Sequence, residues 1–233
     1  ELKTPLTAVR EGVELLRDDV GGRLTPEQHE IVRIARDNTL SLQKLIEDLL
    51  AWHQTRATEP ATLGPVVLSE VVERVIREQK LATLARAIAF DCDLKPLTVV
   101  GDHEKLRTIL DNLVSNAIKY SPRGGTVKVG LRGRDGRALL EVADEGPGVV
   151  PEERERIFET FYQGHAKAEG RIKGSGLGLA IARECARAQG GSIEVTERND
   201  GRNGALFLLS LPLGEREAVL ARERISALLA SDK

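Results

Sequence analysis

The sequence predicts a helical hairpin that forms a four-helix bundle on dimerisation, followed by an α+β sandwich with helices on one face of a sheet. Apolar residues recur every three or four positions across the N-terminal quarter of the chain, as in coiled coils. A segment containing Pro and Gly follows at 58–65 and indicates a linker. Beyond it, short apolar runs alternate with helical patterns, which is typical of an α+β domain.

The predicted hairpin covers residues 1–57. Its first apolar stripe has spacings of 4, 3, 4, 3 and 4 and stops before Gly21 and Gly22. Thr25, Pro26 and Gln28 then form a capping signature that opens a second helix with its own stripe. Two helices bury little surface, so we expect the stripes to pair with a second hairpin; packing against the rest of the chain is the alternative. The stripes are Leu2, Leu6, Val9, Val13, Leu16 and Val20, then Ile31, Ile34, Asn38, Leu42, Leu45, Leu49 and Trp52.

The second domain is predicted over 66–213, with a tail at 214–233 that contains a terminal helix over 215–229. The stretch 146–175 is too long for a plain connector, so we expect a lid over a ligand. The expected strands are 66–68, 88–92, 97–100, 126–131, 138–143, 192–196 and 205–211, and the expected helices are 69–86, 102–120 and 177–189.

Composition excludes several classes of protein. Lys plus Arg (34) nearly balances Asp plus Glu (36) and aromatic residues make up 3%, which argues against a nucleic-acid binder. Cys92 and Cys185 have no paired or metal-type spacing, which is typical of reduced cytoplasmic thiols. No apolar run approaches the ~20 residues of a membrane helix, so we expect no membrane contact. The sequence has no Met, and we expect it to be a piece of a longer protein.

Asn112 and Asn116 lie four residues apart in an apolar helical run, on one stripe with Lys119 and Tyr120. Asn is a mediocre helix former, so two at this spacing indicate a function. An amide oxygen suits Mg²⁺, and Lys119 could neutralise phosphate charge. A solvent-facing amide pair is the alternative.

Asp144 follows a strongly apolar strand and precedes Gly146 and Gly148. A carboxylate there can face a cavity in which a planar base slides against bare backbone, and it can accept a hydrogen bond from an exocyclic amine. Alone the pattern is weak, because Asp and Gly are common in turns.

Gly174, Gly176 and Gly178 lead directly into the predicted helix 177–189. Backbone N–H groups at a helix N-terminus attract phosphate, and glycine lets the phosphate approach closely. The spacing matches neither a dinucleotide fingerprint nor a P-loop.

The predicted lid carries charged and aromatic residues before this turn. Arg171 and Lys173 are candidate phosphate partners, with solvated lid charges as the alternative. Phe158 and Phe161 are two of only four Phe in the chain, and they could either serve the site or pack the lid against the body.

These segments resemble the motifs of sensor histidine kinases of bacterial two-component systems. The run 1–6 resembles the segment that follows the phosphoacceptor, and the other four resemble the ATP-site boxes in their usual order. The resemblance covers residues 1 to about 213. It implies a dimerisation and phosphotransfer hairpin followed by an ATP-binding domain of the type shared with gyrase B, Hsp90 and MutL.

The resemblance also implies a protein histidine kinase that moves the γ-phosphoryl group of Mg²⁺·ATP to a His and then to an Asp of a response regulator. Asn116 would ligate the metal, Asp144 would hold the adenine amine, and Glu1 would hydrogen-bond the phosphorylated imidazole. Thr4 would support dephosphorylation of the regulator. The implied ATP site comprises Asn112, Asn116, Lys119, Tyr120, Asp144, Gly146, Gly148, Phe158, Phe161, Arg171, Lys173, Gly174, Ser175, Gly176, Leu177, Gly178 and Leu179.

The sequence departs from the family pattern at two places. The phosphorylated His of the family stands immediately before the position of Glu1, and the four His of this sequence lie elsewhere. Ala205 stands where the family often has Thr.

Two alternative functions follow: a dimeric nucleotide-binding scaffold without turnover, and another ATPase of the same superfamily. The second is disfavoured because such enzymes place a general-base Glu where Asn112 stands. By analogy with the family we expect this piece to be cytoplasmic and the full-length protein to be anchored in the bacterial inner membrane.

Overall fold

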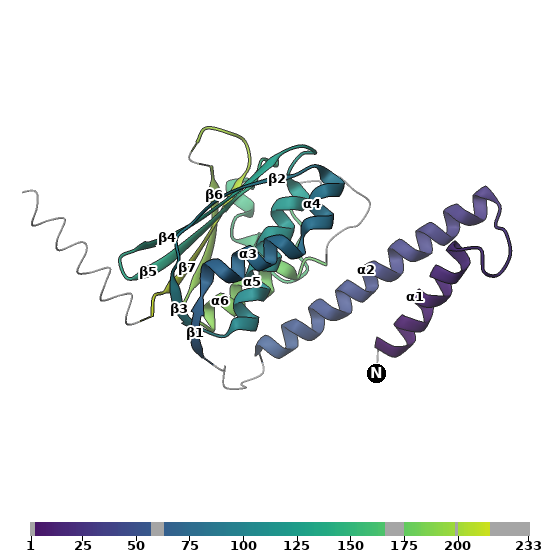
Figure 1. Cartoon of the computed structure of the whole chain (residues 1–233), viewed down its shortest axis with the longest axis horizontal. Helices are drawn as coiled ribbons and strands as arrows, with labels where there is room; N and C mark the ends of the chain where they lie inside the picture. Colours follow the sequence, from purple (N-terminus) through teal and green to yellow (C-terminus); the bar gives the residue numbers. More distant parts are fainter. Residues whose placement is uncertain (1–2, 57–62, 166–174, 199, 215–233) are drawn as a thin grey trace, which may run out of the picture.

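The computed structural model describes residues 3–56, 63–165, 175–198 and 200–214. A helical hairpin is followed by an α+β domain, as the sequence predicts (Figure 1). No helix in these described ranges is long and apolar enough to cross a membrane. The predicted terminal helix over 215–229 lies outside the described residues.

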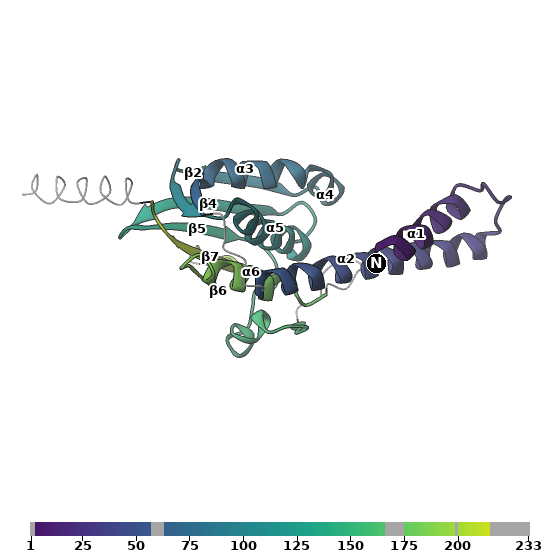
Figure 2. The same ribbon diagram turned by 90° about the horizontal axis from the view of Figure 1, so that it is seen from below.

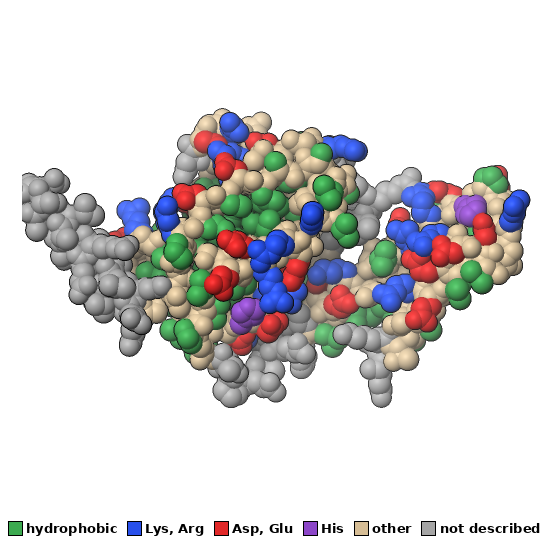
Figure 3. All heavy atoms as spheres, viewed as in Figure 1, with side chains coloured by type: hydrophobic (Ala, Val, Ile, Leu, Met, Phe, Trp, Pro, Cys, Tyr) green, Lys and Arg blue, Asp and Glu red, His purple; other side chains and the backbone are tan. Residues whose placement is uncertain are grey.

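The hairpin consists of α1 (Lys3–Arg17) and α2 (Pro26–Arg56). The predicted capping signature forms a reciprocal capping box. The Thr25 N–H donates to Gln28 Oε1 at 2.8 Å, and the Gln28 N–H donates to Thr25 Oγ1 at 3.3 Å. The sequence therefore determines where α2 begins. On the face of the hairpin seen in Figure 3, acidic and basic side chains are interspersed.

Most of the predicted apolar stripe is exposed in the single chain. Leu6 is buried between the two helices, and Leu45 packs against the core of the second domain. The exposed members of the stripe include Val9, Leu16, Val20, Ile31, Ile34, Leu42 and Leu49. Because α2 is twice as long as α1, its second half runs beyond the hairpin and lies along α6 (Gly178–Arg187) (Figures 1 and 2).

The domain is built on a five-stranded sheet with the order β2-β4-β5-β7-β6. The first pair is parallel and the others are antiparallel. Burial alternates along β4 and β5, as expected for a sheet with one covered face. The strands are β2 (Ala89–Leu94), β4 (Thr126–Arg134), β5 (Arg137–Ala143), β6 (Ser192–Glu197) and β7 (Ala205–Pro212), and a separate two-stranded sheet joins β1 (Gly64–Val67) to β3 (Thr98–Gly101).

The helices α3 (Leu68–Glu78), α5 and α6 pack side by side over the buried face of the sheet. The central helix α5 (His103–Tyr120) is capped by Asp102, whose Oδ1 accepts from the N–H groups of Glu104 and Lys105 at 2.9 and 3.1 Å. Two short 3₁₀ turns, η1 (Pro151–Glu153) and η2 (Arg156–Phe158), lie in the first half of the predicted lid.

Several predicted boundaries differ from the structure, and two of the differences have a clear physical reason. The predicted helix 69–86 divides at Gln79 into α3 (Leu68–Glu78) and α4 (Lys80–Arg86). The buried side chains of α3 end at Val75 and α4 buries none, so the core does not hold the next turns on the axis of α3. The first strand begins at Gly64, so the last two residues of the predicted linker belong to the domain and pair with β3.

The central position of α5 predicts a large loss of stability when its core side chains are shortened. Leu113 is fully buried on α5, and we expect Leu113→Ala to lower the free energy of unfolding by about 2–5 kcal/mol. Leu81 on α4 is 82% exposed, and Leu81→Ala should change the free energy of unfolding by less than about 0.5 kcal/mol. Denaturant unfolding followed by circular dichroism measures both, and equal effects would contradict this account of the core.

Candidate functional site

A cavity of about 790 Å³ lies where α5, the end of β5, the turn before α6 and the second half of α2 meet. This volume is within the range of small-molecule and cofactor pockets. The cavity brings together residues that are far apart in the sequence. Its walls include the predicted residues Asn112, Asn116, Lys119, Tyr120, Asp144, Gly148, Ser175, Gly176, Gly178 and Leu179.

The burial of α5 determines which side chains reach the cavity. Its apolar face is fully buried against the sheet, so Asn112 and Asn116 are turned to the adjacent, half-buried face. Asn112 Nδ2 donates to the backbone oxygen of Thr108 at 2.8 Å. Its Oδ1 lies 2.4 Å from where a Cβ would stand at Gly178. A side chain at position 178 would therefore displace the Asn112 amide from its present position.

Lys119 and Tyr120 are neighbouring polar groups at the end of α5. The Lys119 ammonium lies 5.2 Å from the centre of the Tyr120 ring, a cation–π distance. Burial lowers the pKa of Lys119 and raises the pKa of Tyr120. A partly desolvated ammonium at a cavity wall gains more from an anionic ligand than one in water does.

Asp144 is an almost completely buried carboxylate at the end of β5. Its Oδ1 accepts hydrogen bonds from the Gly146 N–H at 2.8 Å and the Ala205 N–H at 3.1 Å. Burial raises the pKa of Asp144, and the two N–H groups and the Arg198 charge oppose this rise. Among the described residues no donor reaches Oδ2, so this oxygen is available to a ligand in the cavity.

The connection between β6 and β7 supports Asp144 from behind. Arg198 Nη1 donates to the Asp144 backbone oxygen at 2.8 Å, and Arg198 Nε donates to Asp200 Oδ1 at 2.9 Å. Gly204 has φ +137°, and a Cβ there would lie 1.9 Å from the Asp144 oxygen. Only glycine lets the two backbones approach this closely.

The glycine turn before α6 contains a residue in the left-handed conformation. Gly176 has φ +73°, and its oxygen accepts from the Phe161 N–H at 2.9 Å. Ser175 Oγ accepts from the Leu177 N–H at 3.2 Å. Gly178 and Leu179, in the first turn of α6, line the cavity, and the N–H groups at a helix N-terminus favour anions.

Several predicted site residues do not line the cavity. Phe158 and Leu177 are buried in the core, with the Arg183 guanidinium 4.9 Å from the Phe158 ring centre. Phe161 is exposed. Gly146 contributes through the hydrogen bond from its N–H to Asp144. A Cβ at position 146 would lie 2.7 Å from the backbone oxygen of Tyr120. The predicted residues Glu1, Arg171, Lys173 and Gly174 lie outside the described residues, and Thr4 is exposed in the first turn of α1.

Sequence reasoning missed cavity residues on other elements. Lys44 and Asp48 come from α2, and their spacing of four resembles an ordinary surface ion pair. Glu153 is buried at η1, where its Oε1 accepts from the Tyr162 hydroxyl at 2.8 Å and the His165 N–H at 3.1 Å. No motif in the sequence marks these residues, because each depends on how separate segments meet.

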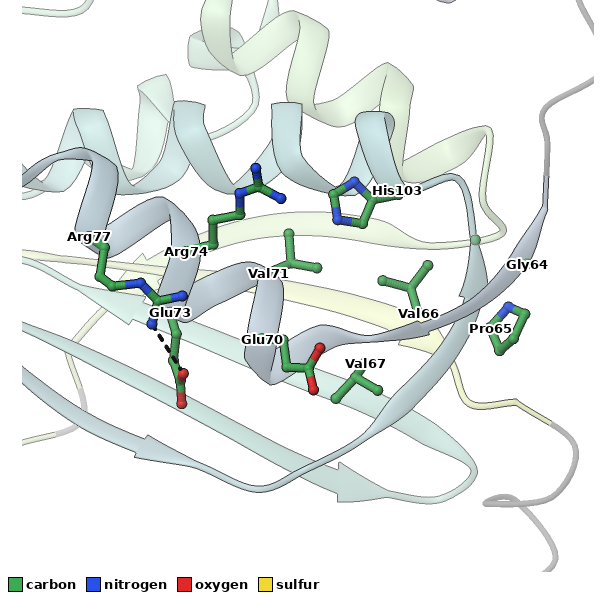
Figure 4. A pocket seen from close by; sticks show the side chains of 11 residues that line it. Gly64, Pro65, Val66, Val67, Glu70, Val71, Glu73, Arg74, Arg77 and His103 are labelled. Carbon is green, nitrogen blue, oxygen red and sulfur yellow. Dashed lines mark hydrogen bonds and ion pairs between the residues drawn. The ribbon is translucent and has the colours of Figure 1, made fainter.

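A second cavity of about 620 Å³ lies between β1, α3 and the start of α5 (Figure 4). It contains none of the predicted site residues. Its charged groups are partly neutralised by one another, as in the pair between Arg77 Nη1 and Glu73 Oε2 at 3.5 Å. The first cavity is therefore the candidate site.

Comparisons with known proteins match both parts of the chain. Residues 1–56 match the His Kinase A (phospho-acceptor) domain, and residues 101–215 match the histidine kinase-, DNA gyrase B- and HSP90-like ATPase. The sensor histidine kinase QseE of Escherichia coli O157:H7 is 39% identical over 212 residues, covering 91% of this chain and 44% of the relative. The kinase/phosphatase MprB of Mycobacterium avium is 36% identical, covering 91% of this chain and 41% of the relative. The chain thus spans less than half the length of these curated relatives.

Solved structures agree with the sequence relatives. Full-length ShkA in complex with AMPPNP has a TM-score of 0.70 at 31% identity, over 91% of this chain and 44% of that one. The mycobacterial sensor histidine kinase MprB has a TM-score of 0.58 at 33% identity, over 65% of this chain and 98% of that one. Its hairpin and its ATPase-type domain match the two domains of these kinases in the same order. The chain therefore belongs to the sensor histidine kinase family.

Proposed function

We propose that this chain is the kinase core that transfers the γ-phosphoryl group of ATP to a His expected just before Glu1. The observation that carries this proposal is the single cavity that unites Asp144, the asparagine stripe of α5 and the glycine turn. Asp144 Oδ2 accepts from the adenine amine, and the N–H groups of the turn together with Lys119 hold the phosphates. Gly148 lies at the cavity wall with φ +76°, a conformation that favours glycine.

A magnesium site here requires oxygens from the nucleotide as well as from the protein. Within the described ranges no three His, Cys, Asp or Glu side chains are grouped to hold a metal. Asn116 is half-buried at the cavity wall with Asn112 one turn away, and its amide oxygen is a ligand that suits Mg²⁺. The residues therefore fit Mg²⁺ bound jointly with phosphates, where the ion would neutralise phosphate charge.

Phosphoryl transfer is mostly positioning and charge neutralisation. The bond from the γ-phosphorus to its bridging oxygen breaks, ADP leaves, and a phosphorus–nitrogen bond forms to the imidazole. Glu1 hydrogen-bonds the other ring nitrogen, which makes the attacking nitrogen more nucleophilic. Movement of the domain relative to the hairpin delivers the phosphoryl group to the His. The phosphoryl group then passes to an Asp of a response regulator.

We further propose that this piece acts in the cytoplasm.

This assignment predicts nucleotide binding that depends on Asp144 and Asn116. In calorimetry with Mg²⁺ present, we expect Asp144→Ala to weaken ATP binding about 10- to 100-fold, because it removes a charge-assisted hydrogen bond. Asn116→Ala should remove the difference between ATP binding with and without Mg²⁺. Asp93→Ala, an exposed carboxylate on β2, serves as the control and should bind like the parent.

Absence of ATP binding by the parent chain would contradict the nucleotide site. Turnover is tested in a chain extended by the His before Glu1. Phosphorylation of that His from labelled ATP supports the kinase, whereas tight binding without phosphorylation would favour the nucleotide-binding scaffold.

The exposed stripe of the hairpin supports a homodimer. Burying an apolar side chain contributes about 1.5–3 kcal/mol, so Ile34→Lys with Leu42→Lys should weaken self-association at least about tenfold. Sedimentation measures the change, and Leu84→Lys on the exposed side of α4 is the control. A parent that sediments as a 25.4 kDa monomer would contradict the dimer.

The exposure of Thr4 in the first turn of α1 supports a role in dephosphorylating the regulator. We propose that its hydroxyl orients the attacking water. Thr4→Ala should slow dephosphorylation of the cognate regulator by about 100-fold and leave ATP binding unchanged. Thr7→Ala, which removes another exposed hydroxyl from α1, is the matched control. Unaltered dephosphorylation in Thr4→Ala would contradict this role.

A further inference from the structure

Asp48 is a buried carboxylate on a part of α2 whose next two residues are exposed. Its exposed fraction is 6%, whereas Leu49 and Leu50 are 47% and 45% exposed. Asp48 is buried where the second domain covers this side of α2, and Leu45 packs against the core of that domain nearby. Asp48 and Lys44 both form part of the wall of the candidate nucleotide cavity.

A short chain of polar contacts connects Asp48 to the glycine turn. Lys44 Nζ lies 2.9 Å from Asp48 Oδ1. The Ser175 hydroxyl donates to Asp48 Oδ2 at 2.5 Å, and Ser175 Oγ accepts from the Leu177 N–H at 3.2 Å. The hairpin therefore holds the turn before α6 through one hydroxyl group.

This contact opposes the binding of phosphate at the same turn. A serine hydroxyl has one proton, so Ser175 cannot donate to Asp48 and to a phosphate oxygen at once. The Asp48 carboxylate also repels a polyanion at close range. Lys44 offsets part of this negative charge, but its side chain is 66% exposed and its charge is correspondingly screened.

We propose that Asp48 and the triphosphate of the nucleotide compete for the Ser175 turn, so that a residue of the phosphotransfer hairpin sets the affinity of the site for phosphate. This inference rests on the proposed nucleotide-binding function. Because coupling between two binding events is reciprocal, a bound triphosphate weakens the contact between α2 and the turn. The domain is thereby released from the hairpin when the donor of the phosphoryl group is in place.

Calorimetry with ATP and with adenosine tests the competition. Asp48→Asn removes the charge with little change of shape and should tighten ATP binding about 5- to 10-fold, whereas Lys44→Met should weaken it. Adenosine carries no phosphate and should bind equally to the parent and to Asp48→Asn. Glu47→Gln makes the same charge change on the exposed neighbouring residue and should leave ATP binding unchanged. An unchanged ATP affinity in Asp48→Asn, or an equal gain for adenosine, overturns the proposal.

Hydrogen exchange without nucleotide tests the contact by itself. Asp48→Ala should increase exchange at the Leu177 amide about tenfold, since the acceptor of that amide loses its own partner. Glu47→Ala should not. Unchanged exchange in Asp48→Ala overturns the role of Asp48. If the parent does not bind ATP, the proposed function fails instead, and the exchange result decides separately whether Asp48 holds the turn.

Discussion

The candidate site depends on the burial of the apolar face of α5. The buried side chains of this helix lie between the sheet and its neighbours α3 and α6, so the helix cannot rotate about its axis. That constraint turns Asn112 and Asn116 towards the cavity. It also places the Asn112 side chain against the start of α6, where a Cβ at position 178 would displace the Asn112 amide. Packing energy in the core thus positions polar groups that contribute little to stability themselves.

Asp144 illustrates how backbone geometry can hold a buried charge. One oxygen of its carboxylate accepts from two backbone N–H groups, and Arg198 lies behind its peptide. These contacts offset the cost of burial without using the second oxygen. A Cβ at Gly148 or Gly204 would meet backbone atoms, so glycine at both positions lets the chain segments around Asp144 approach closely. The site is therefore arranged before a ligand arrives.

The long helix α2 gives the hairpin two different surfaces. Its first half pairs with α1 and exposes an apolar stripe suited to a second copy, while its second half contacts α6 and the glycine turn. One continuous helix, Pro26–Arg56, therefore connects the proposed dimer interface with the proposed nucleotide site.

Local patterns in the sequence determined the elements: the capping box at Thr25, the stripe of Asn112 and Asn116, and the turn at Gly176 all depend on residues close in the chain. Local patterns also misplaced two features. The helix boundary at Gln79 depends on where the core ends, and the strand at Gly64 depends on a partner strand. Only the tertiary structure shows that Lys44, Asp48 and Glu153 line the cavity. It also shows that Phe158 is in the core and Phe161 is exposed, so that neither lines the cavity. The physical reason is that secondary structure follows from hydrogen bonds and side-chain spacing over a few residues, whereas a cavity wall is set by the packing of segments distant in sequence.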